Sequence, residues 1–106
     1  MFVAVSLVMM LAAAPSADSI GSGRKDYSKC LSAQLQPALD KKMTLGDFQS
    51  TLRKTCATQE AAFRAAIVAQ NKADDMSDAE ASSDADEQVA EYFDKIIGEF
   101  EESSRG

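Results

Sequence analysis

The sequence predicts an all-α fold: a small domain of three helices that follows a cleavable signal peptide. Composition is the first observation, because Ala, Leu, Gln, Glu, Lys and Asp predominate after residue 14 and β-branched apolar residues are few. Helices favour Ala and long unbranched side chains, whereas strands favour β-branched and aromatic residues. Periodicity is the second, because apolar residues recur at every third or fourth position in three segments and no alternating run has the length of a strand.

The N-terminus carries the apolar run FVAVSLVMMLAAA, thirteen residues long, followed by the small residues PSADS. A membrane-spanning helix needs roughly 20 apolar residues, whereas the core of a signal peptide needs about 7–15 and ends in small residues. We therefore expect residues 1–19 to be the signal peptide and its cleavage region, and the mature protein to be periplasmic or secreted. The pairs Ala14 with Ser16 and Ala17 with Ser19 both fit the small-x-small cleavage rule.

One property of this segment departs from a typical signal peptide, because no Lys or Arg precedes Arg24. Signal peptides normally open with a basic region. Two alternatives therefore stay open for the apolar run: an N-terminal helix of the folded core, or a retained membrane anchor.

Small residues dominate SADSIGSG, so residues 20–24 are expected to form a flexible spacer before a single helical domain over 25–102. The first helix is predicted at about 25–41, where Tyr27, Leu31, Leu35 and Leu39 recur every four residues. Pro37 interrupts this helix, and proline inside a helix costs about 3 kcal/mol or more. Either the helix kinks at Pro37, or it ends near Gln34 and restarts at Pro37. The apolar stripe stays in phase across Pro37, so we favour a kink.

Two capping patterns open the second and third helices. Thr44, with Asp47 three residues later, predicts a helix over 45–73, and Ser77 with Glu80 is a capping box that predicts a helix over 78–102. A short connection between helices of similar length predicts an antiparallel hairpin. The predicted apolar faces are Leu45, Phe48, Leu52, Cys56, Phe63, Ile67 and Gln70 on the second helix, and Ala81, Ala85, Val89, Phe93, Ile96, Ile97 and Phe100 on the third. The tail, 103–106, is expected to fray.

The chain has two cysteines, Cys30 and Cys56. An even number of cysteines in an exported chain indicates a disulfide, and both lie on or beside the apolar faces of the first two helices. A disulfide between them is therefore the expected structural site. Free buried or intermolecular thiols are the alternative. Catalysis and metal binding are disfavoured, because the two residues do not form C-x-x-C and a zinc site needs about four ligands.

Seven acidic residues and no basic one occupy the stretch 74–87. Calcium takes six to eight oxygen ligands, but the stretch lacks the Gly and the terminal Glu of an EF-hand loop. Asp78 and Glu80 fall in the first turn of the predicted third helix, where negative charge complements the helix dipole. We expect a capping role and a solvated face, with weak divalent-ion binding and docking of a basic partner as alternatives.

The chemistry of the chain disfavours an enzyme. It has no His, so it has no Ser-His or Cys-His nucleophile pair, and it has no glycine-rich phosphate loop. We expect no catalytic residue, no cofactor and no metal site. An enzyme would need two converging carboxylates, which the helical periodicity does not indicate.

The sequence is most consistent with a non-catalytic protein–protein interaction module of the inhibitor, immunity or adaptor type, acting as a monomer or homodimer on another protein. Its net charge of −6 argues against nucleic-acid binding, which depends on Lys and Arg neutralising phosphates, and we expect no stable membrane insertion after signal cleavage. The alternative is an acid- or stress-responsive periplasmic holdase. Below about pH 4 its carboxylates would protonate, and charge repulsion would loosen the hairpin and expose Phe63, Phe93, Ile96 and Phe100.

Overall fold

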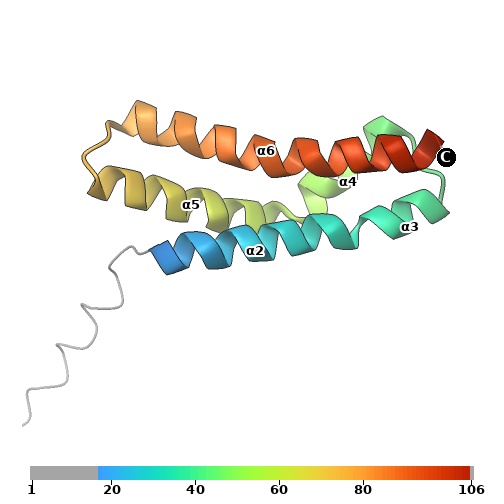
Figure 1. Ribbon diagram of the computed structural model, residues 1–106, viewed down its shortest axis with the longest axis horizontal. Coiled ribbons are helices and arrows are strands. Elements are labelled where there is room, and N and C mark those ends of the chain that lie inside the picture. The colour runs from blue at the N-terminus through green and yellow to red at the C-terminus, as the bar shows by residue number, and fades with distance from the viewer. Residues whose placement is uncertain (1–16, 106) are drawn as a thin grey trace, which may run out of the picture.

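The computed structural model describes residues 17–105, which are helical apart from short turns (Figure 1). The elements are α2 (Ala17–Ala33), α3 (Leu35–Asp40), α4 (Leu45–Thr55), α5 (Ala57–Ala73) and α6 (Asp78–Arg105). This part of the chain has no strand, so the all-α prediction is confirmed. Residues 1–16, most of the predicted signal peptide, lie outside the described residues.

Helix α5 packs against both α2 and α6, whereas α2 and α6 touch each other much less. Helix α6 runs antiparallel to α5 after the turn at residues 74–77, and α3 and α4 lie against its C-terminal half (Figure 1). The side chains that meet between these helices are the predicted apolar faces. Buried members include Tyr27, Leu31, Phe48, Leu52, Phe63, Ile67, Val89, Phe93, Ile96 and Phe100. Leu45 is an exception, because it opens α4 and is 37% exposed.

The prediction of a flexible spacer at residues 20–24 is wrong, because these residues lie inside α2. Packing explains the difference. A Cβ atom at Gly23 would lie 3.0 Å from the Cα of Phe63, so this glycine allows α2 to approach the backbone of α5 closely. Ile20 packs against the same core. A run of small residues serves here as a helix-crossing surface.

The helix predicted over 25–41 is interrupted at Gln34, between α2 and α3, whereas Pro37 itself lies inside α3. The interruption thus comes three residues before the expected kink. The ring of a helical proline clashes with the carbonyl four residues earlier, here that of Ala33. The Gln34 side-chain amide donates a hydrogen bond to the carbonyl oxygen of Cys30 at 3.2 Å. This bond gives a partner to a carbonyl at the end of α2.

The predicted helix over 45–73 is divided at Cys56, which ends α4 and precedes α5. No Gly or Pro lies between residues 47 and 73, so the local sequence contains no signal for this break. Hydrogen bonding continues through it, because the Cys56 amide donates to Leu52 and the Cys56 carbonyl accepts from Glu60. The break coincides with the residue that is crosslinked to α2.

Both predicted caps are present. Thr44 Oγ1 accepts a hydrogen bond from the Asp47 amide at 3.1 Å. Ser77 Oγ accepts from the Glu80 amide at 3.1 Å, and a Glu80 carboxylate oxygen accepts from the Ser77 amide at 3.3 Å. Each of these side chains gives a partner to an amide at a helix start that the helix itself cannot bond.

The prediction of a frayed tail from residue 103 is wrong as far as Arg105, where α6 ends. The buried ring of Phe100 stacks on that of Phe48, with ring centroids 4.3 Å apart. Ser104 Oγ donates to the Phe100 carbonyl oxygen at 2.6 Å. The last turn of α6 is therefore held by a packed aromatic pair.

Candidate functional site

The two cysteines lie together, with Sγ atoms 2.07 Å apart and Cα atoms 5.8 Å apart. Their bond ties the middle of the α2–α3 arm to the junction of α4 and α5. Cys56 is buried at 1% exposure, and Cys30 is half-buried. The disulfide thus fixes three helices relative to one another.

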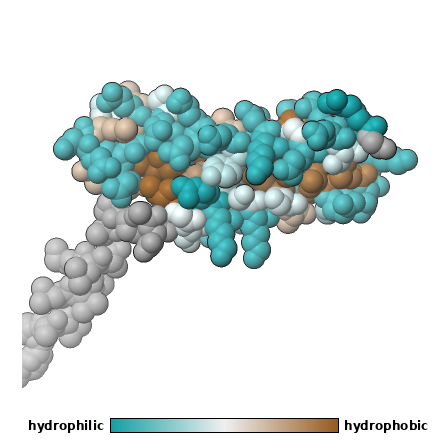
Figure 2. All heavy atoms as spheres, in the orientation of Figure 1, coloured by the Kyte–Doolittle hydropathy of each residue, from teal (hydrophilic) through white to brown (hydrophobic). Residues whose placement is uncertain are grey.

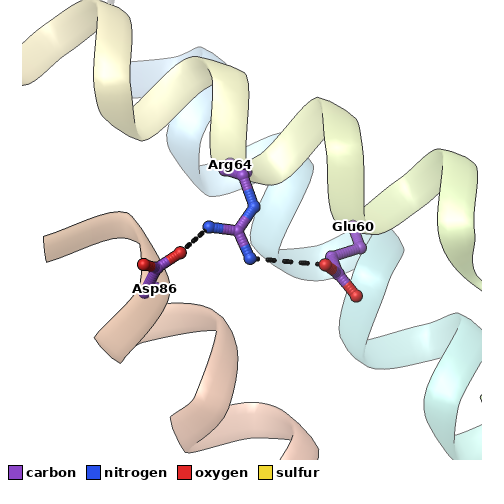
Figure 3. Close-up of polar contacts among 3 residues, drawn as sticks. All are labelled: Glu60, Arg64 and Asp86. Atoms are coloured by element: carbon purple, nitrogen blue, oxygen red, sulfur yellow. Dashed lines mark hydrogen bonds and ion pairs between the residues drawn. The ribbon is translucent and has the colours of Figure 1, made fainter. Parts of the chain in front are cut away.

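Carboxylates of the acidic stretch hold α6 onto α5 (Figure 3). Asp86 forms an ion pair with Arg64, Asp78 forms one with Lys72 at 3.1 Å, and Asp84 accepts a hydrogen bond from the Asn71 amide at 2.8 Å. The expectation of a solvated face therefore misses these contacts between helices. Among residues 17–105, no group of three or more His, Cys, Asp or Glu side chains is arranged to hold a metal ion.

Arg64 reaches from α5 between two carboxylates, Glu60 on its own helix and Asp86 on α6 (Figure 3). Partial burial alone would lower the pKa of Arg64, but the hydrogen bonds to Asp86 and Glu60 raise it above its ordinary value. The guanidinium of Arg64 therefore stays charged at any pH at which the protein is folded.

Tyr27 is the one titratable side chain in the described core, at 1% exposure. Its ring lies against Phe63, with centroids 6.0 Å apart, and its hydroxyl has no hydrogen-bond partner. Burial raises the pKa of Tyr27 to about 12, and the nearby Glu60 carboxylate adds to this effect. A neutral phenol in this position has a structural role, because the ring fills the space between α2 and α5.

A groove runs along the surface between α2 and α6, which contact each other much less than either contacts α5. One hollow of about 590 Å³ is lined by Gly21, Ser28 and Ser32 of α2 and by Tyr92 of α6. A smaller neighbouring hollow shares Ser28, Ser32 and Tyr92 and adds Leu31 and Ile96. Apolar atoms are visible at the surface between α6 and the α2–α3 pair (Figure 2).

A third hollow, of about 510 Å³, lies between α3 and the end of α6. Its apolar lining is Ala38, Leu39, Met43 and Phe100, and its polar lining is Lys42, Ser103 and Ser104. Phe100 lies one helical turn beyond Ile96 on α6, so this hollow continues the line of the first two. We call the three hollows together the α2–α6 groove.

Basic side chains line the first two hollows of this groove. Arg24, Lys25 and Lys29 of α2 line the first hollow, and Lys95 with Glu99 of α6 lines the second. Over residues 17–105, the salt bridges engage other cations, namely Arg64 and Lys72. These four cations of the first two hollows thus face one carboxylate of the lining, and none of them forms a salt bridge with another residue of 17–105.

The groove contrasts with the rest of the molecule. Helix α6 carries ten acidic and two basic residues, a net charge of −8, although the whole chain has a net charge of −6. The cations at the groove therefore form a local reversal of sign beside the most acidic element.

Sequence reasoning did not identify the groove residues. Arg24, Lys25, Ser28, Lys29 and Ser32 lie beside the apolar stripe of Tyr27 and Leu31, at the spacing of one helix flank. The sequence contains this pattern, but the prediction of a spacer at residues 20–24 began the first helix at about residue 25 and left out the first turns of α2. A groove also depends on two helices diverging, which no local pattern reports.

In comparisons with known proteins, no protein family, curated protein or solved structure matches this chain. None of the described helices has the length and apolarity that crossing a membrane would need.

Proposed function

We propose that this protein is an exported, non-catalytic interaction module that binds another protein through the α2–α6 groove. The single observation that carries this proposal is the groove itself: hollows between α6 and the α2–α3 pair, with half-buried Leu39 and Tyr92 in their lining and with cations that form no salt bridge to another residue of 17–105. A binding surface of this kind needs a rigid support, and the disulfide between Cys30 and Cys56 provides one.

Export is supported by two features together. The Cys30–Cys56 pair at disulfide distance is consistent with an oxidising compartment, where disulfides persist, and the apolar run at 2–14 has the length of a signal-peptide core. Because α2 begins at Ala17, cleavage after Ser16 would leave α2 whole. Cleavage after Ser19 would remove its first turn, next to Ile20. The intact mass of the protein recovered from its native compartment tests this, and we expect a chain that starts at Ala17 and contains no free thiol.

Partner binding is tested by affinity capture from an extract of the same compartment, using the wild-type protein and two variants. Ser28→Trp with Ser32→Trp fills the groove, whereas Thr58→Trp places the same side chain on an exposed position of α5 outside every hollow described above. We expect a specific protein to be retained by the wild type and by Thr58→Trp, and lost from the groove-filled variant. Equal retention by all three proteins would exclude the groove as the binding site.

A second candidate function is an acid-responsive holdase, and the attachment of α6 favours it. Asp78, Asp84 and Asp86 hold α6 on α5, and carboxylates in general are protonated at pH 2–3. Loss of these contacts, with 11 basic residues left uncompensated, would release α6 and expose Phe93 and Ile96. An aggregation assay with a client protein at pH 2.5 and at pH 7 tests it: protection only at pH 2.5 supports the holdase, and no protection at either pH removes it.

A further inference from the structure

We infer that the occupant of the α2–α6 groove is an acidic amphipathic helix of a partner protein, an inference that rests on the proposed function. Such a helix would place its apolar side chains on the groove floor and its carboxylates beside Arg24, Lys25, Lys29 and Lys95. Three properties of the groove favour this occupant: its shape, its floor and its charge.

Shape favours a helix. The groove runs along α2 and α3 from Gly21 to Leu39, about 27 Å at ~1.5 Å per residue, or roughly five helical turns. Its walls are helices, and a further helix laid between α2 and α6 would complete a four-helix bundle. A strand would bring unpaired backbone amides and carbonyls, and the helical walls offer no free strand edge to pair with them.

The floor requires apolar side chains from the occupant. Leu31, Ile96 and Phe100 form the base and are only 2–4% exposed, so most of the apolar surface that an occupant can contact belongs to Leu39 and Tyr92, which are half-buried. On α6 these residues lie about one turn apart, at Tyr92, Ile96 and Phe100, whereas Leu31 and Leu39 on the other wall lie about two turns apart. An amphipathic helix presents apolar residues at three- and four-residue spacing, which matches this floor along its length.

The charge of the groove selects an anionic occupant. Four cations line the first two hollows against one carboxylate, Glu99, and Lys42 lines the third. Nucleic acid does not fit, because both the backbone phosphates and α6 are strongly negative. A flat anionic bilayer laid over the groove would meet the ten carboxylates of α6, whereas a helix inside the groove can place its own carboxylates on the α2 side.

Two occupants from this chain itself are disfavoured. A second copy offers α6 as its most acidic helix, but the apolar face of α6 is already buried in its own domain. The N-terminal run FVAVSLVMMLAAA is apolar but has no carboxylate, so it leaves the cations without a partner. Both occupants remain outcomes of the experiments below.

The first experiment measures binding of two designed 18-residue helical peptides by fluorescence anisotropy. Both have the same leucine face, one with Glu and the other with Lys on its flanks. We expect the Glu peptide to bind the exported protein and to bind more weakly as salt is raised, because exposed charge pairs are screened. Equal binding of the two peptides, or binding of neither, would overturn the inference.

Charge-reversal variants make this test specific to the groove. Lys25→Glu with Lys29→Glu changes two groove cations, and Lys41→Glu with Lys54→Glu makes the same charge change at exposed positions outside it. We expect the groove pair to weaken binding of the Glu peptide by about tenfold or more, and the control pair by much less. Equal weakening by the two pairs would show attraction to overall charge and would overturn the inference. Circular dichroism on both variants establishes that they are folded.

The second experiment separates failure of this inference from failure of the proposed function. A photoreactive amino acid is placed at Ser32 in the groove or at Thr58 outside it, and crosslinks formed in the native compartment are mapped by mass spectrometry. A crosslink from Ser32 to an acidic amphipathic segment of another protein supports the inference. A partner crosslinked only from Thr58 leaves the proposed function standing and overturns the groove as its site. A Ser32 crosslink to residues 2–14 or to a second copy assigns the groove to this chain, and no crosslink from either position overturns both proposals.

Discussion

The contact between α2 and α5 and the contact between α5 and α6 hold the same central helix by different means. At α2–α5 there is a covalent crosslink, a backbone approach at Gly23 and the buried ring of Tyr27 on Phe63. At α5–α6 the apolar residues of α6 are also buried, but the polar contacts along the edge are carboxylates paired with Arg64, Lys72 and Asn71.

This difference predicts different responses to solution conditions. A covalent bond and a close steric contact do not depend on salt or moderate acid, whereas exposed carboxylate contacts weaken with both. The α2–α5 unit is thus the fixed part of the molecule, and α6 is the element that pH and salt can loosen. Because α6 forms one wall of the α2–α6 groove, its attachment also controls the width of the groove.

The largest effect should come from removing the crosslink. Cys30→Ser with Cys56→Ser opens a loop defined by a sequence separation of 26 residues, which the chain-entropy treatment values at about 3.5 kcal/mol. We expect a loss of this size in the free energy of unfolding, measured by urea denaturation, with little dependence on salt. A loss below about 1 kcal/mol would show that packing alone fixes α2 on α5.

The next effect should appear at high pH, through Tyr27. Its pKa in the folded protein is about 12, above the ordinary value near 10. Between these values the unfolded chain loses the phenolic proton while the folded chain keeps it, so stability is complete below pH 10 and is lost as pH rises toward 12. The expected loss is about 2 to 3 kcal/mol.

The control for this effect is Tyr27→Phe, which keeps the ring and removes a hydroxyl that has no hydrogen-bond partner. Urea denaturation of both proteins at pH 9 and pH 11.5 isolates the effect of the Tyr27 hydroxyl, because every other side chain is the same in the two proteins. We expect the variant to be at least as stable as the wild type at pH 9 and to lose less stability at pH 11.5. Parallel losses in the two proteins would show that the hydroxyl reaches solvent.

The sequence predicted the parts of this fold that local chemistry determines. The stripe through Tyr27 and Leu31, the cap at Thr44 and the capping box at Ser77 each rest on neighbours within one or two helical turns. The pairing of Cys30 with Cys56 followed from there being two cysteines on apolar faces. The burial of Phe63, Phe93 and Phe100 followed from the same periodicity.

The features that sequence reasoning missed depend on contacts between distant segments. Gly23 has low helix propensity, and only the approach of Phe63 explains its place in α2. The break at Cys56 lies in a stretch without Gly or Pro and coincides with a crosslink 26 residues away in sequence. The groove exists because α2 and α6 contact each other at few positions. Only this geometry brings the cations of α2 and Lys95 of α6 to the edge of the same groove.

Gly23→Ala sharpens the comparison by adding one methyl group to the α2–α5 crossing. Its Cβ would lie 3.0 Å from the Cα of Phe63, and because backbone cannot rotate away, the helices must separate. Overpacking of this kind costs typically 1–3 kcal/mol, and we expect a loss of about 2 kcal/mol in the free energy of unfolding, measured by urea denaturation.

Gly21→Ala is the matched control, since nothing lies within 4 Å of its added Cβ. In the same helix this substitution should stabilise the protein by about 0.5–1 kcal/mol. Stabilisation by both substitutions would mean that helix propensity, and not packing, decides at residue 23.

The smallest effect tests the other side of the comparison, the ion pair between Arg64 and Asp86. Their side chains are 35% and 66% exposed, and exposed pairs contribute about 0.2–1 kcal/mol. A double-mutant cycle with Arg64→Met and Asp86→Asn should give a coupling of about 0.5 kcal/mol at low salt that approaches zero at about 1 M, where the Debye length is ~3 Å. The loss of unfolding free energy caused by Cys30→Ser with Cys56→Ser should show no such dependence on salt. If the Arg64–Asp86 coupling persists at high salt, α6 is fixed as firmly as α2, and the groove has two rigid walls.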